Sequence, residues 1–416
     1  MNALPIPSFG HADGLRVLFI TNECAGLGHL RRTITLARAV TEADRAATAL
    51  IVTGSAALGS FELPERVDTV KLPVFRRESD GRLYAATLKV GMPMIETLRA
   101  DILRSAALAF DPDVVVVDKT PLGLRSELVP MLEELRRIGR ARIVLGLRNV
   151  EDDPERVRAA WAEADMLGAL DRYYDHAVVY GPANTTGDAL SCLGGVELPV
   201  PVTHVGFIGN PPAITAPADL PEGYLLVTVG GGSDGHDVID AVLDADEHER
   251  FEFPIVIVTG PLMPVDDVAR LAARCDGEHT RLFDVRNDMA QVIVGARAVV
   301  TMGGYNTISE VLQSGTPALV VPRVRPSTEQ LIRANDLVAL GLAEMLHPDA
   351  IAPERTRQAV VQTTERPRRP IGDADYRGAA RTAQLLVDLA AGASAGQANA
   401  IDGPTAELGD PCLAEA

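Results

Sequence analysis

The stretch that decides the fold is VTVGGGSDGHDVIDAVL (227–243), which runs from an apolar strand through a glycine turn into a helix. Its glycines allow a tight turn and bring bare backbone N–H groups to the start of the helix. The positive end of the helix dipole favours an anion at the same place. The pattern therefore predicts a site for a phosphate or diphosphate.

The same turn matches two other motifs. Gly230, Gly232 and Gly235 satisfy the G-x-G-x-x-G pattern of dinucleotide-binding proteins, but the next strand, FPIVIVTG, ends without the acidic residue that would bind a ribose hydroxyl. Gly231, Ser233 and Gly235 satisfy the G-x-S-x-G pattern of serine hydrolases, but the sequence has no HGGG-type oxyanion segment beside it. A structural turn that binds no ligand is the third alternative.

Strands and helices alternate around this stretch. Apolar runs such as LRVLFITN, DVVVVD and RIVLGL precede a Pro-rich passage at 198–223, and runs such as YLLVTVG, TRLFDV and AVVTMGG follow it. Continuous apolar runs are typical of parallel strands covered on both faces. A chain of 416 residues also favours two domains over one. We therefore expect an α/β protein of the GT-B type of architecture, in which two Rossmann-like, doubly wound domains face each other across a cleft.

Composition shifts and loop signals set the expected boundaries. They are a flexible N-terminus (1–13), an N-terminal domain (14–208), a linker (209–222), a C-terminal domain (223–370), a terminal helix (371–391) and a disordered tail (392–416).

Charge and cysteine content exclude several classes of function. The formal net charge of −18 repels nucleic acids and anionic lipid surfaces, so we expect neither nucleic-acid binding nor membrane association. The four cysteines show no CxxC spacing, which argues against a disulfide framework and a structural zinc site. The sequence has no signal-peptide pattern and no apolar run of membrane-spanning length. We expect a soluble cytoplasmic protein without a bound metal.

A second strand, glycine turn and helix pattern lies at 301–323, TMGGYNTISEVLQSGTPALVVPR. Thr307 and Glu310 have the spacing of a capping box, in which the glutamate would only satisfy backbone N–H groups. Ser327 and Gln330 repeat that spacing. Local sequence thus explains these side chains without a ligand.

Together, three segments resemble the nucleotide-sugar domain of GT-B glycosyltransferases, and most closely family 28, which includes the N-acetylglucosaminyltransferase of peptidoglycan synthesis. These segments are GGGSDG, FDVRNDMAQVIVGARAVVTMGGYNTISEVLQSGTPALVVPR and STEQLIRANDL. The resemblance covers most of the second domain and AGLGHLRR (25–32) in the first.

The resemblance implies transfer of a sugar from a nucleotide donor, UDP-linked, to a hydroxyl acceptor, with inversion and without a metal or cofactor. The glycine turn would receive the diphosphate, Glu310 the ribose hydroxyls, residues 285–289 the base, and Glu329 and Gln330 the donor sugar. The donor-binding residues implied are Gly230, Gly231, Gly232, Ser233, Asp234, Gly235, Arg286, Asn287, Met289, Gly303, Gly304, Asn306, Thr307, Glu310, Glu329 and Gln330.

AGLGHLRR supplies the candidate catalytic residue. Gly26 and Gly28 would allow close approach to the donor and acceptor, and His29 lies at the start of a helix, whose dipole keeps the ring neutral. A neutral histidine suits a general base that deprotonates the acceptor hydroxyl. The alternative is a histidine that caps the helix or packs in the core. We expect Arg31 and Arg32 on the helix surface, with the alternative that one of them counters phosphate charge.

The acceptor is predicted to be a small molecule or a glycan. Asp118, Lys119 and Arg148 follow first-domain strands and are candidates to bind it, although each could instead form a structural ion pair. The pattern G-x-G-H-x-x-R also resembles the UDP-sugar hydrolase of pseudaminic acid synthesis, in which water replaces the acceptor. A non-catalytic nucleotide-sugar sensor is a further alternative. The sequence shows no clear apolar patch flanked by basic residues, the feature by which the family's lipid-acceptor enzyme docks at membranes.

Overall fold

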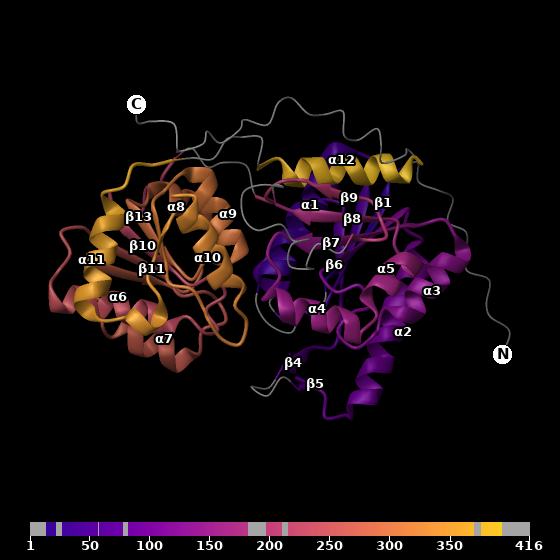
Figure 1. The fold of residues 1–416 in the computed structure, drawn as a ribbon, viewed down its shortest axis with the longest axis horizontal. Helices are drawn as coiled ribbons and strands as arrows, with labels where there is room; N and C mark the ends of the chain where they lie inside the picture. Colours follow the sequence, from indigo (N-terminus) through magenta and orange to yellow (C-terminus); the bar gives the residue numbers. More distant parts are fainter. Residues whose placement is uncertain are drawn as a thin grey trace.

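Two parallel sheets, each covered by helices, form the two halves of the molecule (Figure 1). The computed structural model describes residues 14–21, 27–56, 58–77, 82–181, 197–209, 215–369 and 376–392.

The first sheet has the strand order β3-β2-β1-β6-β7-β8-β9, with every neighbouring pair parallel. The order reverses between β1 and β6, and ligands of such sheets bind where the order reverses, beyond the carboxyl ends of the strands. Its strands are β1 (Arg16–Thr21), β2 (Thr48–Thr53), β3 (Val67–Lys71), β6 (Val114–Asp118), β7 (Arg142–Arg148), β8 (His176–Tyr180) and β9 (Val202–His204).

Helices bury both faces of this sheet, as its continuous apolar strands predict. Val17 and Phe19 of β1 pack in one apolar cluster, whereas Leu18 and Ile20 point to the opposite face and pack in another. The first-domain helices are α1 (Gly28–Ala43), α2 (Met92–Phe110), α3 (Val129–Ile138), α4 (Pro154–Glu163) and α5 (Met166–Tyr173), with a short 3₁₀ turn at Leu58–Ser60.

The second sheet repeats the design in the order β12-β11-β10-β13-β14-β15, again all parallel, and reverses between β10 and β13. Its strands are β10 (Leu225–Thr228), β11 (Ile255–Val258), β12 (Thr280–Phe283), β13 (Ala298–Thr301), β14 (Ala318–Val320) and β15 (Glu344–Met345). Its helices are α6 (His236–His248), α7 (Val265–Ala272), α8 (Met289–Gly295), α9 (Tyr305–Ser314), α10 (Glu329–Ala339) and α11 (Pro353–Thr364), with a 3₁₀ turn at Pro348–Ala350.

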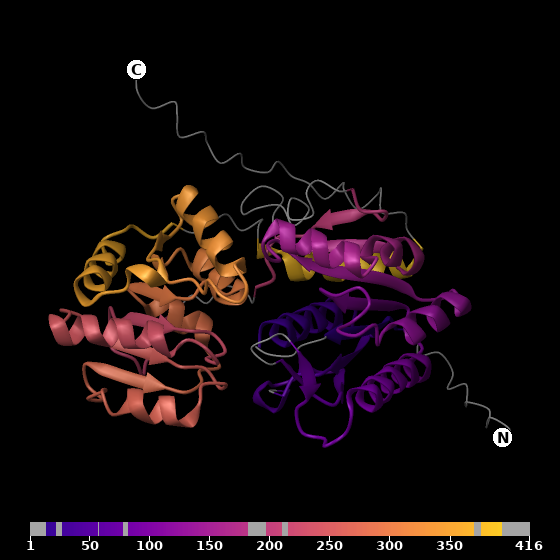
Figure 2. The same cartoon turned by 60° about the horizontal axis from the view of Figure 1, so that its bottom comes forward.

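The end of the chain returns to the first domain. Helix α12 (Gly378–Ala390) packs against α1, and both ribbon views show it beside the first sheet (Figure 1 and Figure 2). The sequence predicts this helix at 371–391. Its apolar face explains the return, because Leu385, Leu386 and Leu389 join the same apolar cluster as α1.

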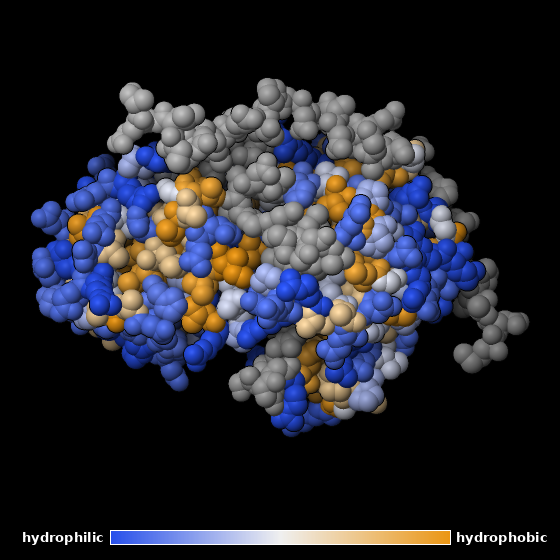
Figure 3. All heavy atoms as spheres, viewed as in Figure 1, coloured by the Kyte–Doolittle hydropathy of each residue, from blue (hydrophilic) through white to orange (hydrophobic). Residues whose placement is uncertain are grey.

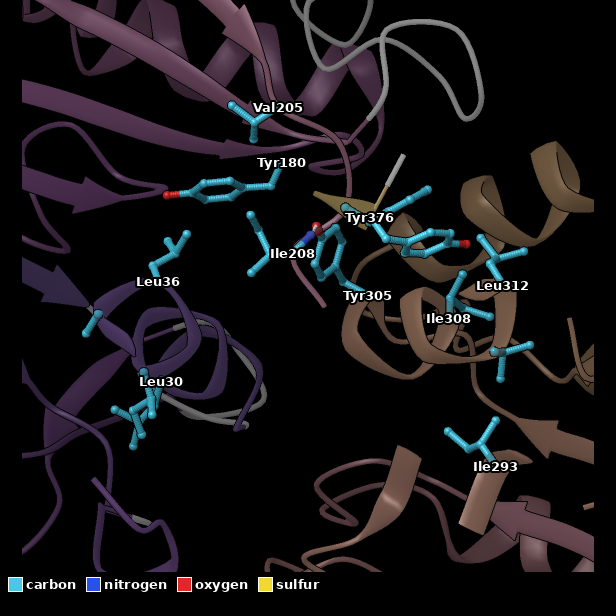
Figure 4. Close-up of a cluster of buried hydrophobic side chains, with 14 of the residues drawn as sticks. Leu30, Leu36, Tyr180, Val205, Ile208, Ile293, Tyr305, Ile308, Leu312 and Tyr376 are labelled. Atoms are coloured by element: carbon cyan, nitrogen blue, oxygen red, sulfur yellow. Dashed lines mark hydrogen bonds between the residues drawn. The ribbon is translucent and has the colours of Figure 1, made fainter. Parts of the chain in front are cut away.

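That apolar cluster continues across the junction of the two domains (Figure 4). The Phe207 ring stacks on Tyr376, with centroids 5.8 Å apart, and lies 6.2 Å from the Tyr305 ring of α9. The backbone N–H of Ile208 donates to the Tyr305 hydroxyl at 3.0 Å. The connection between the domains is therefore packed and hydrogen-bonded at this point.

An antiparallel hairpin, β4 (Phe75–Arg77) with β5 (Leu83–Ala85), was not expected from the sequence. In Figure 3 the projecting end formed by β5 and α2 carries apolar side chains at its surface. The exposed apolar residues of this segment are Tyr84, Leu88, Val90, Met94 and Leu98. Arg82 and Lys89 are exposed in the same segment, so an apolar stretch with basic neighbours exists here that the sequence analysis did not find. Within the described residues, no helix is long and apolar enough to cross a membrane.

A fully buried ion pair anchors this hairpin. Arg99 of α2 donates to both carboxylate oxygens of Glu127, at 2.6 and 2.8 Å, and both side chains are 0% exposed. The same guanidinium donates to the carbonyl of Pro73 and lies over the Phe75 ring at 4.3 Å. One side chain thus joins α2, β4 and the segment that precedes α3.

We predict that Arg99→Ala lowers the free energy of unfolding by about 3–5 kcal/mol, because it leaves the Glu127 carboxylate buried and unpaired. Urea denaturation followed by circular dichroism measures the change. Arg104→Ala, an exposed arginine on the same helix, is the matched control and should change stability by less than about 0.5 kcal/mol. Equal effects of the two changes would contradict the role given to the buried pair.

Candidate functional site

The first group of site residues lies where the order of the first sheet reverses. His29 is in the first turn of α1, which follows β1, and Asp118 is the last residue of the neighbouring strand β6. The His29 Nδ1 atom lies 2.5 Å from Asp118 Oδ2. Arg32, one helical turn after His29, donates from Nη2 to both Asp118 oxygens at 2.7 and 2.8 Å. The three side chains form one hydrogen-bonded group.

Electrostatics fix the protonation of this group. Burial alone would raise the pKa of Asp118, but Arg32 and His29 outweigh it and hold that pKa far below its ordinary value. Burial lowers the pKa of His29, and the nearby Arg32 and Arg148 lower it further, against the opposing effect of Asp118. A neutral ring that donates from Nδ1 to the Asp118 carboxylate keeps its lone pair on Nε2. His29 therefore has the state that a general base needs.

Arg32 is buried, with 2% of its side chain exposed, so the expectation that it lies on the helix surface is wrong. Its guanidinium lies 5.0 Å from the centre of the Tyr180 ring and 5.4 Å from that of Tyr305. The Asp118 carboxylate is buried at the carboxyl end of β6 and needs a cation. Arg32 supplies it, because Arg32 lies three residues after His29 and so shares the helix face that points to Asp118. Since Tyr305 belongs to the second domain, the group is completed across the junction.

A second group also crosses the junction. Arg148, at the end of β7, donates to Glu329 Oε2 of α10 at 2.7 Å, and Arg333 donates to Glu329 Oε1 at 2.7 Å. Lys119 Nζ lies 3.2 Å from Glu151 Oε2, and Glu151 in turn contacts Arg148. Burial would raise the pKa of Glu329, but Arg148 and Arg333 outweigh it and lower that pKa. Asp118 and Arg148 are thus in buried ion pairs, whereas the Lys119 side chain is 40% exposed.

A third group joins α1 to α9. Arg31 forms an ion pair with Glu310, and the Asn306 amide donates to the carbonyl of Gly28 at 3.1 Å. The capping-box interpretation of Glu310 is wrong, because α9 begins at Tyr305 with Gly304 as its N-cap and Thr307 lies inside the helix. The surface expectation for Arg31 is wrong too, since the buried Glu310 carboxylate holds it at the junction.

The glycine turn after β10 has the shape that an anion site requires. Gly230 and Gly232 have φ angles of 68° and 88°, in the left-handed region that favours glycine. A Cβ on Gly232 would lie 2.2 Å from the Thr259 carbonyl oxygen, so only glycine fits there. The turn leads into α6 at His236, with Gly235 as its N-cap.

The other side chains of this turn face solvent. Ser233 and Asp234 are exposed, and Asp234 pairs with Arg323 at 3.0 Å. Gly231 lies in the same loop, at the reversal point of the second sheet. The corresponding turn after β13 holds Gly303, with φ 84°, and Gly304. Both glycine turns therefore lie beside each other at the carboxyl ends of β10 and β13.

The remaining predicted donor residues lie in two more loops of the second domain. Arg286 pairs with Asp219 and Asp288, and its guanidinium lies over Phe283, so its side chain is already engaged. Asn287 is exposed, and Met289 is the first residue of α8.

Gln330 Oε1 accepts the backbone N–H of Arg323 at 2.8 Å, and Ser327 Oγ accepts that of Glu329 at 3.3 Å. Ser327 therefore makes the contact of a capping side chain, but the second capping box is incomplete, because the Gln330 side chain binds the backbone of Arg323 instead of Ser327.

The sequence analysis missed Arg32, Arg333, Glu151, Tyr180 and Tyr305. Three of them carry a local signal: Arg32 lies three residues after His29, Arg333 four residues after Glu329, and Glu151 three residues after Arg148. Tyr180 and Tyr305 come from distant elements. Gly26 lies outside the described residues. Within the described part of the chain, no group of three or more His, Cys, Asp or Glu side chains is placed to bind a metal.

The C-terminal part of the chain is similar to a glycosyltransferase family. Residues 225–386 match the family model described as "Glycosyltransferase family 28 C-terminal domain". A Brucella anthropi protein, UDP-N-acetylglucosamine--N-acetylmuramyl-(pentapeptide) pyrophosphoryl-undecaprenol N-acetylglucosamine transferase, is 27% identical over 227 residues, which is 51% of this chain and 59% of that protein. The chain spans between 34% and 59% of the length of the curated relatives it matches.

Solved structures share the whole architecture. The glycotransferase of kitacinnamycin superposes with a TM-score of 0.58 at 17% identity, covering 91% of this chain and 99% of that one. MurG of Acinetobacter baumannii has a TM-score of 0.53 at 15% identity, covering 94% and 96%. The predicted GT-B fold is therefore confirmed, and the second domain is family 28-like.

We predict that His29 titrates below the ordinary histidine pKa of about 6.5, because burial disfavours the charged ring. Asp118→Asn should lower the His29 pKa further, since it removes the carboxylate that favours imidazolium. NMR titration of the ring nitrogens measures both, with His29→Gln to assign the signal.

The folded pKa of His29 lies below the unfolded one, so its contribution to stability is present above about pH 6.5 and is lost as the pH falls. A His29 midpoint above 6.5 would contradict this description of the site.

Proposed function

We propose that the protein is a glycosyltransferase that moves a sugar from a UDP-linked donor to a hydroxyl group of a small-molecule or glycan acceptor. One observation carries the proposal: the reversal points of the two sheets meet at His29. The His29–Asp118 pair lies at the reversal point of the first sheet. Helix α9, at the reversal point of the second sheet, reaches the residue before His29, because Asn306 donates to the Gly28 carbonyl. The family 28 match of the second domain supports a nucleotide-sugar donor there.

The donor would bind to the second domain. The glycine turn at 230–235 would hold the diphosphate with its backbone N–H groups and the dipole of α6. Glu310 would accept hydrogen bonds from the ribose hydroxyls, and the backbone of 285–289 would hold the base. Glu329 and Gln330 would contact the donor sugar.

The chemistry follows from these positions. His29 Nε2 takes the proton of the acceptor hydroxyl while the acceptor oxygen bonds to the anomeric carbon. The bond from that carbon to the diphosphate oxygen breaks, and its electron pair leaves with the diphosphate. Attack opposite the leaving group inverts the anomeric carbon. Asp118 holds the ring by Nδ1 and stabilises the imidazolium that forms, as the acid of a triad does. Lys119, the exposed cation beside this group, would contact the acceptor.

We predict that UDP and one UDP-sugar bind with micromolar affinity, measured by calorimetry against dTDP-glucose and GDP-mannose. Glu310→Gln should weaken this binding about tenfold, or about 1.4 kcal/mol, because the ribose hydroxyls lose a charged acceptor. Glu278→Gln, an exposed glutamate of the same domain, is the control and should bind as the wild type does. If no nucleotide binds, the proposed donor site is wrong.

We further predict that His29→Gln lowers the transfer rate by about 10²–10⁴-fold while the affinity for UDP stays within twofold, because the base acts only on the acceptor. Product analysis with and without acceptor measures the reaction. Free sugar released at an undiminished rate in the presence of acceptors would identify a hydrolase instead. Full transfer activity in His29→Gln would exclude His29 as the base.

A further inference from the structure

The two carboxylates proposed to bind donor hydroxyls are both occupied by arginines of the first domain. Arg31 of α1 pairs with Glu310, and Arg148 of β7 pairs with Glu329. Each pair joins an element of one domain to an element of the other. In this structure, first-domain arginines therefore occupy carboxylates to which the donor would bind.

The Glu310 pair lies at a hollow between the two domains. The hollow beside it is lined by Arg31, Arg32 and Thr35 of α1, by Asn306 and Glu310 of α9, and by Ile208 and Gly209 of the connection between the domains. The Arg31 guanidinium is bonded to Glu310 Oε1, so a ribose hydroxyl that binds this oxygen must displace it.

The two carboxylates differ in the partners that remain when their first-domain arginine leaves. Glu329 keeps Arg333 as a partner at 2.7 Å when Arg148 leaves. Glu310 is 6% exposed, and burial raises its pKa against the lowering effect of Arg31. A buried carboxylate that loses its cation needs new hydrogen-bond donors. Two ribose hydroxyls supply such donors, so the ribose and Arg31 are alternative partners of the same carboxylate.

Arg31 is less enclosed than its neighbour Arg32. Its side chain is 28% exposed, unlike that of Arg32, which is 2% exposed and fixed by Asp118. On leaving Glu310, the Arg31 guanidinium therefore moves into solvent that its side chain already partly faces. The neighbouring Asn306–Gly28 hydrogen bond crosses the same junction and would break with it when the domains separate.

We propose that Arg31 is a gate on donor binding: it holds α1 against α9 through Glu310 in the empty protein, and the donor ribose displaces it. This inference rests on the proposed function, because it takes Glu310 as the ribose acceptor. A stronger contact between Arg31 and Glu310 therefore holds the empty protein closed more firmly and lowers its affinity for the donor. Arg31 sets both properties without binding the donor itself.

The test measures UDP binding by calorimetry in single and double variants. Arg31→Gln should bind UDP about threefold to tenfold more tightly than the wild type, since the competitor for Glu310 is gone. Arg38→Gln, an exposed arginine on the same helix, is the matched control and should be unchanged. In a Glu310→Gln background, Arg31→Gln should have no further effect. Unchanged or weaker binding by Arg31→Gln would overturn the gate.

A second readout separates the gate from the proposed function. Hydrogen–deuterium exchange of the backbone amides of residues 28–35 and 305–310 should be faster in Arg31→Gln than in Arg38→Gln without any nucleotide. If no nucleotide binds the wild type or Arg31→Gln, the proposed function fails, and the exchange rates alone decide whether Arg31 closes the junction. Equal exchange in both variants would refute the closing contact.

Arg31→Lys serves if Arg31→Gln does not fold. It keeps a positive charge but loses the planar guanidinium, so its UDP affinity and exchange rates should lie between those of the wild type and of a protein without the pair. Two results together would count against the gate. The first is a wild-type UDP affinity and wild-type exchange rates in Arg31→Lys. The second is that Glu310→Gln leaves the exchange rates unchanged.

Discussion

The Asp118 carboxylate is the group on which the rest of the site depends. It ends β6 beside β1, buried at the point where the sheet order reverses, and a carboxylate there requires compensation. Arg32 supplies the charge and His29 the second contact, which fixes the first turn of α1 against the strand ends. Because the Tyr305 ring covers Arg32 from the other domain, the same carboxylate also determines how α9 meets α1.

The junction between the domains combines two kinds of interaction. The apolar cluster around Phe207 and Tyr376 holds the connection and α12 in place, independent of any ligand. The charged contacts of Arg31 and Arg148 involve two of the proposed donor residues, Glu310 and Glu329. Apolar packing at the connection therefore lies beside charged contacts that the proposed gate would release. The buried pair of Arg99 and Glu127 instead holds the hairpin to α2.

Sequence reasoning succeeded where short-range physics decides the outcome. The apolar runs became strands because their neighbours on both faces are apolar helices, and the glycine turn after β10 formed because its backbone angles require glycine. It failed where two local explanations compete. Thr307 and Glu310 have capping spacing, but Gly304 begins the helix three residues earlier, so Glu310 points to the junction instead. The two-residue β15 and the β4–β5 hairpin are too short to give a pattern.

The sequence by itself determined two doubly wound layers, the glycine turns, and a histidine at the start of the first helix, because strand periodicity, left-handed backbone angles and helix starts depend on neighbouring residues. Only the tertiary structure decided which charges meet. Arg32 and Asp118 are 86 residues apart, Arg148 and Glu329 are 181 apart, and Arg31 and Glu310 are 279 apart. Burial selects these partners, since a charge enclosed at the junction must pair with whatever opposite charge the two sheets bring beside it.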